Sequence, residues 1–422
     1  MSRMESILNS GEYSLTWQTG MEEIDKSAWD ALAIPAESPF LEWDWLSLLE
    51  RSGCVSRATE WMPLHLTLWH EEELAAAAPM YVRTDSSGEF VFDHIWQEAA
   101  RQLGIEYYPK LVGMTPFTPM PGYRFLTAPG YDEDELIRAM SHAVDRLCQR
   151  AGFSGSHFHF VDAKWSAKLR RQGYGLWQHQ GFLWENPGYR DFDDFLSRFS
   201  SRQRKTIRRE RKAMTRAGVT FSLYRGEEIP HGAMDQMYDF YLRTNRQYGP
   251  WACLHLNRAF FRELPERCPG RLLLVCAYQE EEDEPVAMAL LVHKGTRLYG
   301  RYWGSRRDIP YLHFNTCFYQ PIEWAIRNGI QTFDPGIGGA HKHRRGFRPV
   351  PQFSVHTFHS PILQQVFQAY VPELNRMARQ RIRAIKEEMP WRRETEDRGQ
   401  RTEDRGQRSE TSGQGTEDED QG

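Results

Sequence analysis

The sequence predicts an α/β protein made of two similar units with mixed, mainly antiparallel sheets. The first observation is a strand, helix, strand order over residues 298–333, which is typical of a βαβ unit. The second is a pattern shared by both halves of the chain, in which an acidic turn precedes an alanine-containing strand at 74–80 and again at 286–291. The third is the length of 422 residues, which is enough for two ordinary domains with sizeable cores.

The composition is that of a globular protein and excludes several other classes. Hydrophobic residues make up 40% of the chain and aromatic residues 13%, which is too much for a disordered protein. The net charge of -4 argues against a protein that binds nucleic acid over its whole surface. No long apolar run occurs, so we expect no membrane span. The N-terminus lacks a signal-peptide pattern and the six cysteines lack CxxC spacing, which together predict a cytoplasmic protein with reduced thiols.

The N-terminal unit is expected to span residues 1–185. Its proline-rich loop at 115–121 is stiff and poor in backbone donors, which suits the lining of a pocket. An apolar strand is expected to lead up to Asp93. The other expected elements are strands at 13–17, 65–69, 74–82 and 157–161, a strand that opens at 107, and helices at 41–52, 97–104 and 136–150.

The C-terminal unit is expected to span residues 186–390, followed by a disordered, low-complexity tail at 391–422. The tail contains the heptapeptide TEDRGQR twice in succession and almost no apolar residue. A long helical pattern at 192–216 ends before Gly218. The other expected elements are strands at 220–224, 271–278, 285–293, 297–304 and 355–359, and helices at 234–248 and 362–389.

Residues 298–349 combine the βαβ pattern with a cluster of functional side chains. The helix of this unit begins at Pro310 and is capped by Asn328 and Gly329. The strand after it leads directly into a glycine-rich loop at 336–339, and five basic residues follow. Because open α/β sheets bind ligands beyond the carboxyl ends of their strands, this loop is the predicted functional site.

Three ordered stretches carry a resemblance to a known family. They are GEFVFDHIWQEAARQLGIEYYPKLVGMTPFTP, then SSRQRKTIRRERK, and then the set YGRYWGS, LHFNTCFYQPIEWAIRNGI and GAHKHRRGFRP. Over roughly residues 38–380 the chain resembles the FemAB-like, GNAT-related predicted N-acyltransferases, sometimes labelled peptidoglycan biosynthesis or recognition proteins. The resemblance implies tandem GNAT-like domains that face each other across a cleft, and transfer of an acyl group to an amine. Ala340 stands where the family pattern places an acidic residue.

Acyl transfer to an amine requires a base, donors for the oxyanion, and cations or backbone amides for the phosphates of the acyl donor. His341 is the expected base, because its unperturbed pKa lies near neutral pH. Lys342 and Arg345 can stabilise the oxyanion or bind phosphate. The competing interpretation is a surface histidine hydrogen-bonded to a carbonyl for His341, and a solvated loop cation for Lys342 and Arg345. Asp93 is a second candidate base, although a helix N-cap is the favoured role at its position.

The resemblance also implies where the substrates bind. Acyl-coenzyme A is the expected co-substrate, with no permanently bound cofactor, although the phosphate-loop sequence of acetyltransferases is not present. The donor is expected along the strand that carries Arg301, Tyr302, Trp303 and Gly304, with Arg306 and Arg307 in the place of the phosphate loop. From the residues themselves, the amine acceptor is expected near Tyr108, Lys110, Phe117, Asp334, Gly338 and Gly339, with core packing as the competing interpretation of Tyr108.

Metal and thiol chemistry are not expected. The four histidines at 341, 343, 356 and 359 have no carboxylate or cysteine at ligand spacing. His313 and Cys317 lie one helical turn apart, as a base and a thiol nucleophile would. Cys317 is surrounded by apolar residues, however, so core packing is the favoured interpretation.

The basic helix from Arg202 to Arg216 is a rival signal. Its Lys and Arg residues fit RNA, DNA or an aminoacyl-tRNA, whereas the interruption by Glu210 fits a solvated helix face. Three functions therefore stay open. The first is an N-acyltransferase that uses acyl-coenzyme A, and the second is a non-catalytic recognition protein for a cell-wall precursor or nucleic acid, which Ala340 favours. The third is an aminoacyl-tRNA-dependent peptidyl transferase of the Fem type.

Overall fold

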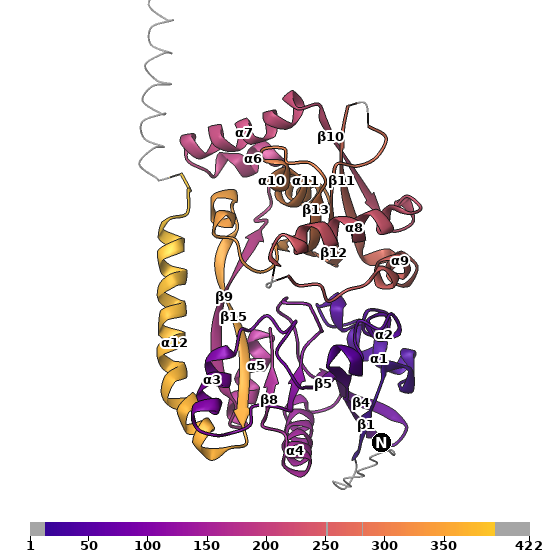
Figure 1. Cartoon of the computed structure of the whole chain (residues 1–422), viewed down its shortest axis with the longest axis vertical. Coiled ribbons are helices and arrows are strands. Elements are labelled where there is room, and N and C mark those ends of the chain that lie inside the picture. Colours follow the sequence, from indigo (N-terminus) through magenta and orange to yellow (C-terminus); the bar gives the residue numbers. More distant parts are fainter. Residues whose placement is uncertain (1–12, 250–251, 281, 393–422) are drawn as a thin grey trace, which may run out of the picture.

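The computed structural model describes residues 13–249, 252–280 and 282–392, without the side chain of Ala340. The chain forms two lobes, with the first half of the sequence in one lobe and most of the second half in the other (Figure 1). The tail predicted to be disordered lies outside the described residues from 393 onwards. Within the described residues, no helix is both long and apolar enough to cross a membrane.

The first lobe begins with a small antiparallel sheet covered by helices. Its strands are β1 (Tyr13–Gln18), β3 (His65–His70), β4 (Glu73–Ala78) and β7 (Leu126–Thr127), in that order. The strand predicted at 74–82 is in fact two strands, because Pro79 separates β4 from β5 (Met80–Arg83), which joins another sheet. Proline has no backbone N–H to donate to a ladder, so the chain changes sheets there. The helices of this half are α1 (Lys26–Ala33), α2 (Trp43–Arg51), α3 (His94–Gln102), α4 (Glu133–Ala151) and α5 (Ala163–Arg171).

One sheet of eleven strands runs through both lobes. Its strands in spatial order are β10 (Val219–Arg225), β11 (Leu272–Gln279), β12 (Ala287–Lys294), β13 (Arg297–Ser305), β14 (Thr332–Asp334), β9 (Gly175–Glu185), β15 (Arg348–Phe358), β8 (Gly155–Phe158), β6 (Lys110–Gly113), β5 and β2 (Trp61–Pro63). The neighbours β13 and β14 run parallel, as do β6 and β8, and the other neighbouring strands of this sheet are antiparallel. The sheets are therefore mixed and mainly antiparallel, as predicted.

The end of the chain returns to the first lobe. Strand β15 pairs with β8 on one side and with β9 on the other. Helix α12 (Pro361–Glu387) packs on β9 and β15 and contacts α3. Figure 1 shows this helix along one side of the molecule, with its last turns near the second lobe. The segment 348–387, which the sequence places in the second unit, therefore lies in space against the first.

The second lobe contains the predicted βαβ unit. Strands β13 and β14 are parallel, and the connection between them contains α10 (Leu312–Phe314), a π-helical turn (Asn315–Tyr319) and α11 (Gln320–Arg327). Gly329 follows with a φ of 67°, as the predicted helix end requires. The helix predicted at 192–216 is in fact two helices, α6 (Phe192–Ser197) and α7 (Ser201–Arg216), because the Ser200 side chain accepts from the backbone of Gln203 and starts a new helix. The lobe also contains α8 (Ala233–Arg246) and α9 (Arg258–Arg267).

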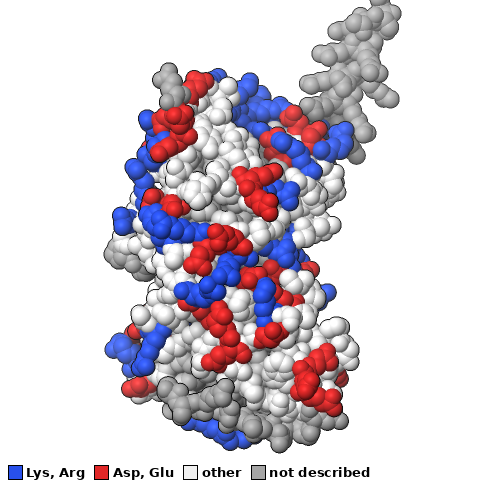
Figure 2. Space-filling view, turned by 90° about the vertical axis from the view of Figure 1, so that its right-hand side faces the viewer, with Lys and Arg blue, Asp and Glu red and all other residues white. Residues whose placement is uncertain are grey.

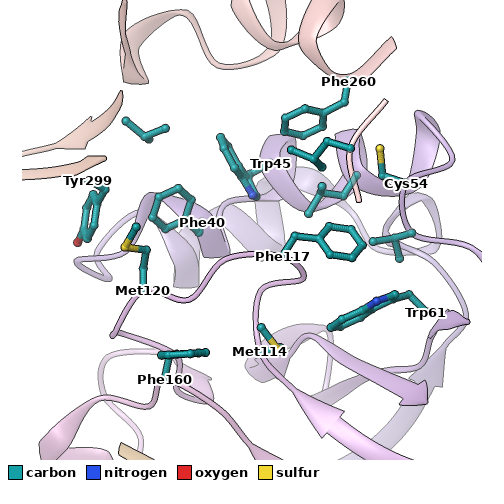
Figure 3. Packing of buried hydrophobic residues seen from close by; sticks show 14 of the residues in the cluster. Phe40, Trp45, Cys54, Trp61, Met114, Phe117, Met120, Phe160, Phe260 and Tyr299 are labelled. Atoms are coloured by element: carbon teal, nitrogen blue, oxygen red, sulfur yellow. The ribbon is translucent and has the colours of Figure 1, made fainter. Parts of the chain in front are cut away.

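A shared hydrophobic cluster joins the two lobes. Figure 3 shows Phe40 and Trp45 of the first lobe beside Tyr299 and Phe260 of the second. The ring centroids of Trp45 and Phe260 lie 5.6 Å apart, and those of Phe40 and Tyr299 lie 5.2 Å apart. On the face drawn in Figure 2, positive and negative side chains alternate where the lobes meet. The lobes are thus held by a continuous core rather than by a polar contact alone.

Candidate active site

A cavity of about 480 Å³ lies where strands β13 and β14 separate. The first lobe, strand β13, helix α8 and the loop after β14 all contribute to its wall, so both lobes are needed to form it. Its size is that of a small-ligand pocket. The wall includes Phe117 and Met120 from the first lobe, Gly300–Trp303 from β13, Tyr241 from α8, and Gly338, Gly339, His341 and Lys342 from the loop.

The two parallel strands open because the chain turns sharply after β14. Their pairing ends where Tyr299 meets Asp334, and Pro335 follows with no backbone N–H to continue the ladder. The Asp334 carboxylate accepts from the backbone N–H of Gly336 at 2.8 Å, and Gly336 has a φ of 84°. The loop 336–339 is therefore directed away from β13, and the space between them is the cavity. Asp334 is buried and holds this turn rather than lining the cavity.

Lys342 is a buried lysine at the wall of the cavity, with 4% of its surface exposed. Its Nζ donates to the carbonyl oxygens of Gly336 at 2.7 Å and Ile337 at 3.2 Å. An ammonium has three N–H donors, so one donor is left for a ligand. Burial lowers the pKa of Lys342 to about 8, although the nearby Asp334 carboxylate opposes the shift. Burial likewise raises the pKa of Asp334 to about 6, against the hydrogen bond from Gly336 and the charge of Lys342.

His341 lies beside Lys342 against a wall of aromatic rings. The ring centroids of Phe314 and Phe318 are 5.4 Å and 5.8 Å from that of His341. Burial, with the charges of Arg345 and Lys342, lowers the pKa of His341 to about 4, so the imidazole is neutral near pH 7. Its Nε2 has no hydrogen-bond partner among the described residues.

The glycine-rich loop fits closely around these two side chains. A Cβ on Gly339 would lie 2.9 Å from Cε1 of His341 and 3.3 Å from Cε of Lys342. Gly339 also has a φ of 80°, which other residues rarely adopt. The loop therefore requires glycine here both for its backbone and for the close approach of His341.

Arg345 faces away from this cavity and toward helix α7. Its Nη2 donates to Oε1 of Glu210 at 2.8 Å, and its Nη1 donates to the backbone oxygen of His341 at 3.1 Å. The hydroxyl of Tyr319 also donates to the Glu210 carboxylate. Glu210 is 4% exposed, so it is a buried partner that holds the His341 turn and not a break in a solvated face.

Only some of the residues predicted to bind the donor line the cavity. Tyr302, Trp303 and Arg301 line the cavity, and Arg301 donates to the backbone oxygen of Phe117 at 2.8 Å. Gly304 instead packs directly against α8. A Cβ at this position would lie only 2.2 Å from the backbone oxygen of Phe240. Arg306 and Arg307 lie outside the cavity, where they pair with Glu282 and Glu284 on the acidic turn after β11.

Three predicted residues of the first lobe are gathered in another place. Lys110 is fully buried, and its Nζ lies 2.6 Å from Asp93 and 2.8 Å from Glu89. The hydroxyl of Tyr108 is hydrogen-bonded to the hydroxyl of Ser86, which also accepts a hydrogen bond from Nζ of Lys110. Burial would raise the pKa of Asp93, but Lys110 holds it well below its usual range. Asp93 occupies the N-cap position of α3 without a side-chain cap bond, and the segment 84–93 that leads up to it contains no strand, contrary to the prediction. None of the three lines the cavity.

The structure adds residues that the sequence did not indicate. Tyr241, Thr244 and Asn245 line the cavity from α8, where an aromatic stripe was the only available signal. His313 and Cys317, which the sequence assigned to the core, also reach the cavity wall. Burial raises the pKa of the Cys317 thiol and lowers that of His313 to about 3, so neither carries a charge near neutral pH. Among the described residues, no group of three or more potential ligands could hold a metal ion.

Comparisons with known proteins identify the fold and a family. A family model described as peptidoglycan biosynthesis/recognition, FemAB-like, matches residues 20–393. No curated protein sequence matches the chain. FemX is similar in structure with a TM-score of 0.50 and 11% identity, over 82% of this chain and 98% of that one.

Two further solved structures are similar. The C-terminal domain of a protein named as a lysylphosphatidylglycerol synthetase, from Agrobacterium fabrum, has a TM-score of 0.52 and 11% identity, over 83% of this chain and 97% of that one. A tandem GNAT protein from the clavulanic acid biosynthesis pathway has a TM-score of 0.44 and 10% identity, over 83% and 99%. The predicted α/β class with mixed, mainly antiparallel sheets is confirmed, and the chain shares its fold with FemX.

Proposed function

Because this chain belongs to the FemAB-like family of peptidoglycan biosynthesis and recognition proteins, we propose that it is an N-acyltransferase that acts on an amine in a cell-wall precursor. The family and the fold support acyl or aminoacyl transfer in cell-wall biosynthesis. The observation that carries the proposal is the buried Lys342, held by two loop carbonyls beside a neutral His341 at the wall of the cavity.

The reaction needs no nucleophile from the protein. The nitrogen lone pair of the acceptor forms the new C–N bond, and the carbonyl oxygen of the donor becomes an oxyanion. His341 takes a proton from the attacking amine, and the free N–H of the Lys342 ammonium donates to the oxyanion. The oxyanion then collapses, the bond from the carbonyl carbon to the donor's sulfur or oxygen breaks, and the leaving group receives the proton that His341 took from the amine.

The two side chains have the charges that these roles require. A neutral imidazole can accept a proton, and the pKa of about 4 keeps His341 neutral at physiological pH. A pKa of about 8 leaves most Lys342 side chains protonated at neutral pH, as a hydrogen-bond donor to the oxyanion must be. The rings of Phe314 and Phe318 give His341 a partly apolar environment, in which electrostatic interactions are stronger than in bulk water.

The proposal leaves two acyl donors and one alternative function to be tested. Acyl-coenzyme A is the expected donor from the fold, and an aminoacyl-tRNA is the alternative. A recognition protein without turnover is the second candidate function, and the ion pairs that occupy Arg306 and Arg307 favour it because they remove two expected phosphate ligands.

The test is a transfer assay with each donor. Acetyl-coenzyme A and lysyl-tRNA are supplied with a lysine-containing peptidoglycan stem peptide, and amide formation is followed by mass spectrometry. We expect Lys342→Met and His341→Gln to reduce turnover at least about 100-fold with either productive donor. The control, Lys294→Met, removes a largely buried lysine outside the cavity. Unchanged turnover in the first two variants would remove the site assignment, and tight binding of the stem peptide without turnover of any donor would favour recognition.

A further inference from the structure

A second cavity, of about 760 Å³, lies between helix α7 and the turn Ala340–Arg345. Residues of α7, of the turn and of the short segment that follows α12 form its wall, together with Ser200 and Phe314. The side chain of Gln203 donates to the backbone oxygen of Arg344 at 2.8 Å, which fixes the turn to the helix. The cavity is therefore a built space between two bonded elements, and not a gap beside a loose loop.

The wall of this second cavity is rich in positive charge. Arg202 and Arg209 of α7 and Arg344 of the turn line it, and no hydrogen bond or ion pair of their side chains joins them to a described residue. Arg345 also lines it but is neutralised by Glu210. The only other carboxylate of the wall is Glu388, so three free guanidinium groups face one carboxylate within the described residues.

His341 belongs to the walls of both cavities. The proposed base therefore borders the basic cavity as well as the cavity that Lys342 lines. A ligand with its anionic part against α7 and its reactive carbonyl beside Lys342 would pass His341. Guanidinium groups bind phosphate oxygens in pairs, and an excess of them in a cavity is the ordinary device for phosphate recognition.

We propose that the second cavity holds the phosphate groups of a nucleotide-linked acyl donor. The inference rests on the proposed acyl transfer and adds the donor's binding site to it. The expected phosphate position at Arg306 and Arg307 is occupied by Glu282 and Glu284, whereas the arginines of the second cavity have no such partners among the described residues. Phosphates of coenzyme A and phosphodiesters of the 3′ end of a transfer RNA offer the same chemistry to these arginines.

The test measures binding rather than turnover. Coenzyme A and the ribonucleotide CCA are titrated calorimetrically into the full chain at several salt concentrations. We expect one of the two to bind, and the double variant Arg209→Gln/Arg344→Gln to weaken that binding at least about tenfold. The slope of log affinity against log salt should fall by about 1 for each phosphate that the variant no longer binds.

The matched control is Lys205→Gln/Lys212→Gln. It removes the same charge from positions of α7 that are exposed, as Arg209 and Arg344 are, but that do not line the cavity, so binding should change less than about twofold. Equal weakening in both double variants would show a diffuse charge effect and overturn the proposal. Binding of neither probe, or binding unaffected by Arg209→Gln/Arg344→Gln, would also overturn it.

The two proposals fail in different ways. Suppose that the Lys342 and His341 variants lose turnover but donor binding does not depend on the arginines. The proposed acyl transfer would then be supported, and the second cavity would not be the phosphate site. If donor binding depends on the arginines but no amide is formed, the phosphate site would be supported and the proposed transferase activity would be rejected. Which probe binds then separates a coenzyme A donor from a transfer RNA donor.

Discussion

Two opposing effects act on the pKa of Lys342. Burial lowers its pKa from 10.5 to about 8, and the Asp334 carboxylate works against this shift. A charge that favours the ammonium raises its pKa, so removal of the carboxylate lowers the pKa further. Because the proposed role requires the ammonium, activity should decline as pH rises through the pKa of Lys342.

We therefore expect kcat to fall above about pH 8 and Asp334→Asn to move this alkaline limb to lower pH. An asparagine oxygen can still accept from the Gly336 N–H, so the turn is retained. The profile is measured from about pH 6 to about pH 10 for the variant and for the surface control Asp308→Asn. An alkaline limb that stays in place in Asp334→Asn would mean that Lys342 does not carry the titrating proton.

Single residues were predictable where their neighbours in the sequence are also their neighbours in space. His341 and Lys342 follow a glycine-rich loop at the end of a strand, and the structure puts both on the cavity wall. Asp93 and Lys110 were also predicted to be site residues from their positions in the chain, but in the structure they form a buried ion pair away from the cavity. Their pairing depends on how strand β6 meets the segment 86–93, and a local pattern does not contain that contact.

At the scale of elements, the close packing of α8 on β13 depends on one glycine. The position of Gly304 would place a Cβ 2.2 Å from the backbone oxygen of Phe240 and 2.6 Å from its carbonyl carbon. Backbone atoms cannot rotate away as a side chain can, so the helix itself must shift. The helix carries Tyr241, which lines the first cavity, so the shift would also disturb the site.

We expect Gly304→Ala to lower the free energy of unfolding by about 1–3 kcal/mol, as overpacking does. Gly270→Ala is the control, because a Cβ there meets no atom within 4 Å. Urea denaturation followed by circular dichroism compares the two variants with the unchanged protein. Similar midpoints for all three would show that α8 moves without cost.

Elements were predictable in kind and order but not always in number. The βαβ unit over β13 and β14 has the predicted order, since its apolar periodicities and its glycine stop are local. The predicted strand at 74–82 and helix at 192–216 each proved to be two elements. Pro79 and Ser200 were the available signals, but the apolar periodicity continues through both positions and hides the two breaks.

The whole molecule is organised by contacts between distant parts of the sequence. Strand β15 lies between β8 and β9, so the first lobe is completed by residues from near the end of the chain. Helix α12 covers the same strands, and the ring centroids of Trp96 and Phe367 are 4.8 Å apart. A sequence read in order suggests consecutive units, because the pairing partner of a strand is not encoded in its own pattern.

The fragment 1–185 is therefore expected not to fold by itself, although it matches the predicted first unit. Without β15 it would leave β8 and β9 unpaired along the edges that β15 joins, and without α12 it would expose Trp96 and Trp177. Thermal unfolding followed by circular dichroism should show no cooperative transition for the fragment. The fragment 1–392 is the control and should unfold like the full chain, because it retains every described element. A cooperative transition in fragment 1–185 would instead show that β15 and α12 are additions to a unit that is already stable, and the lobes would then be independent domains.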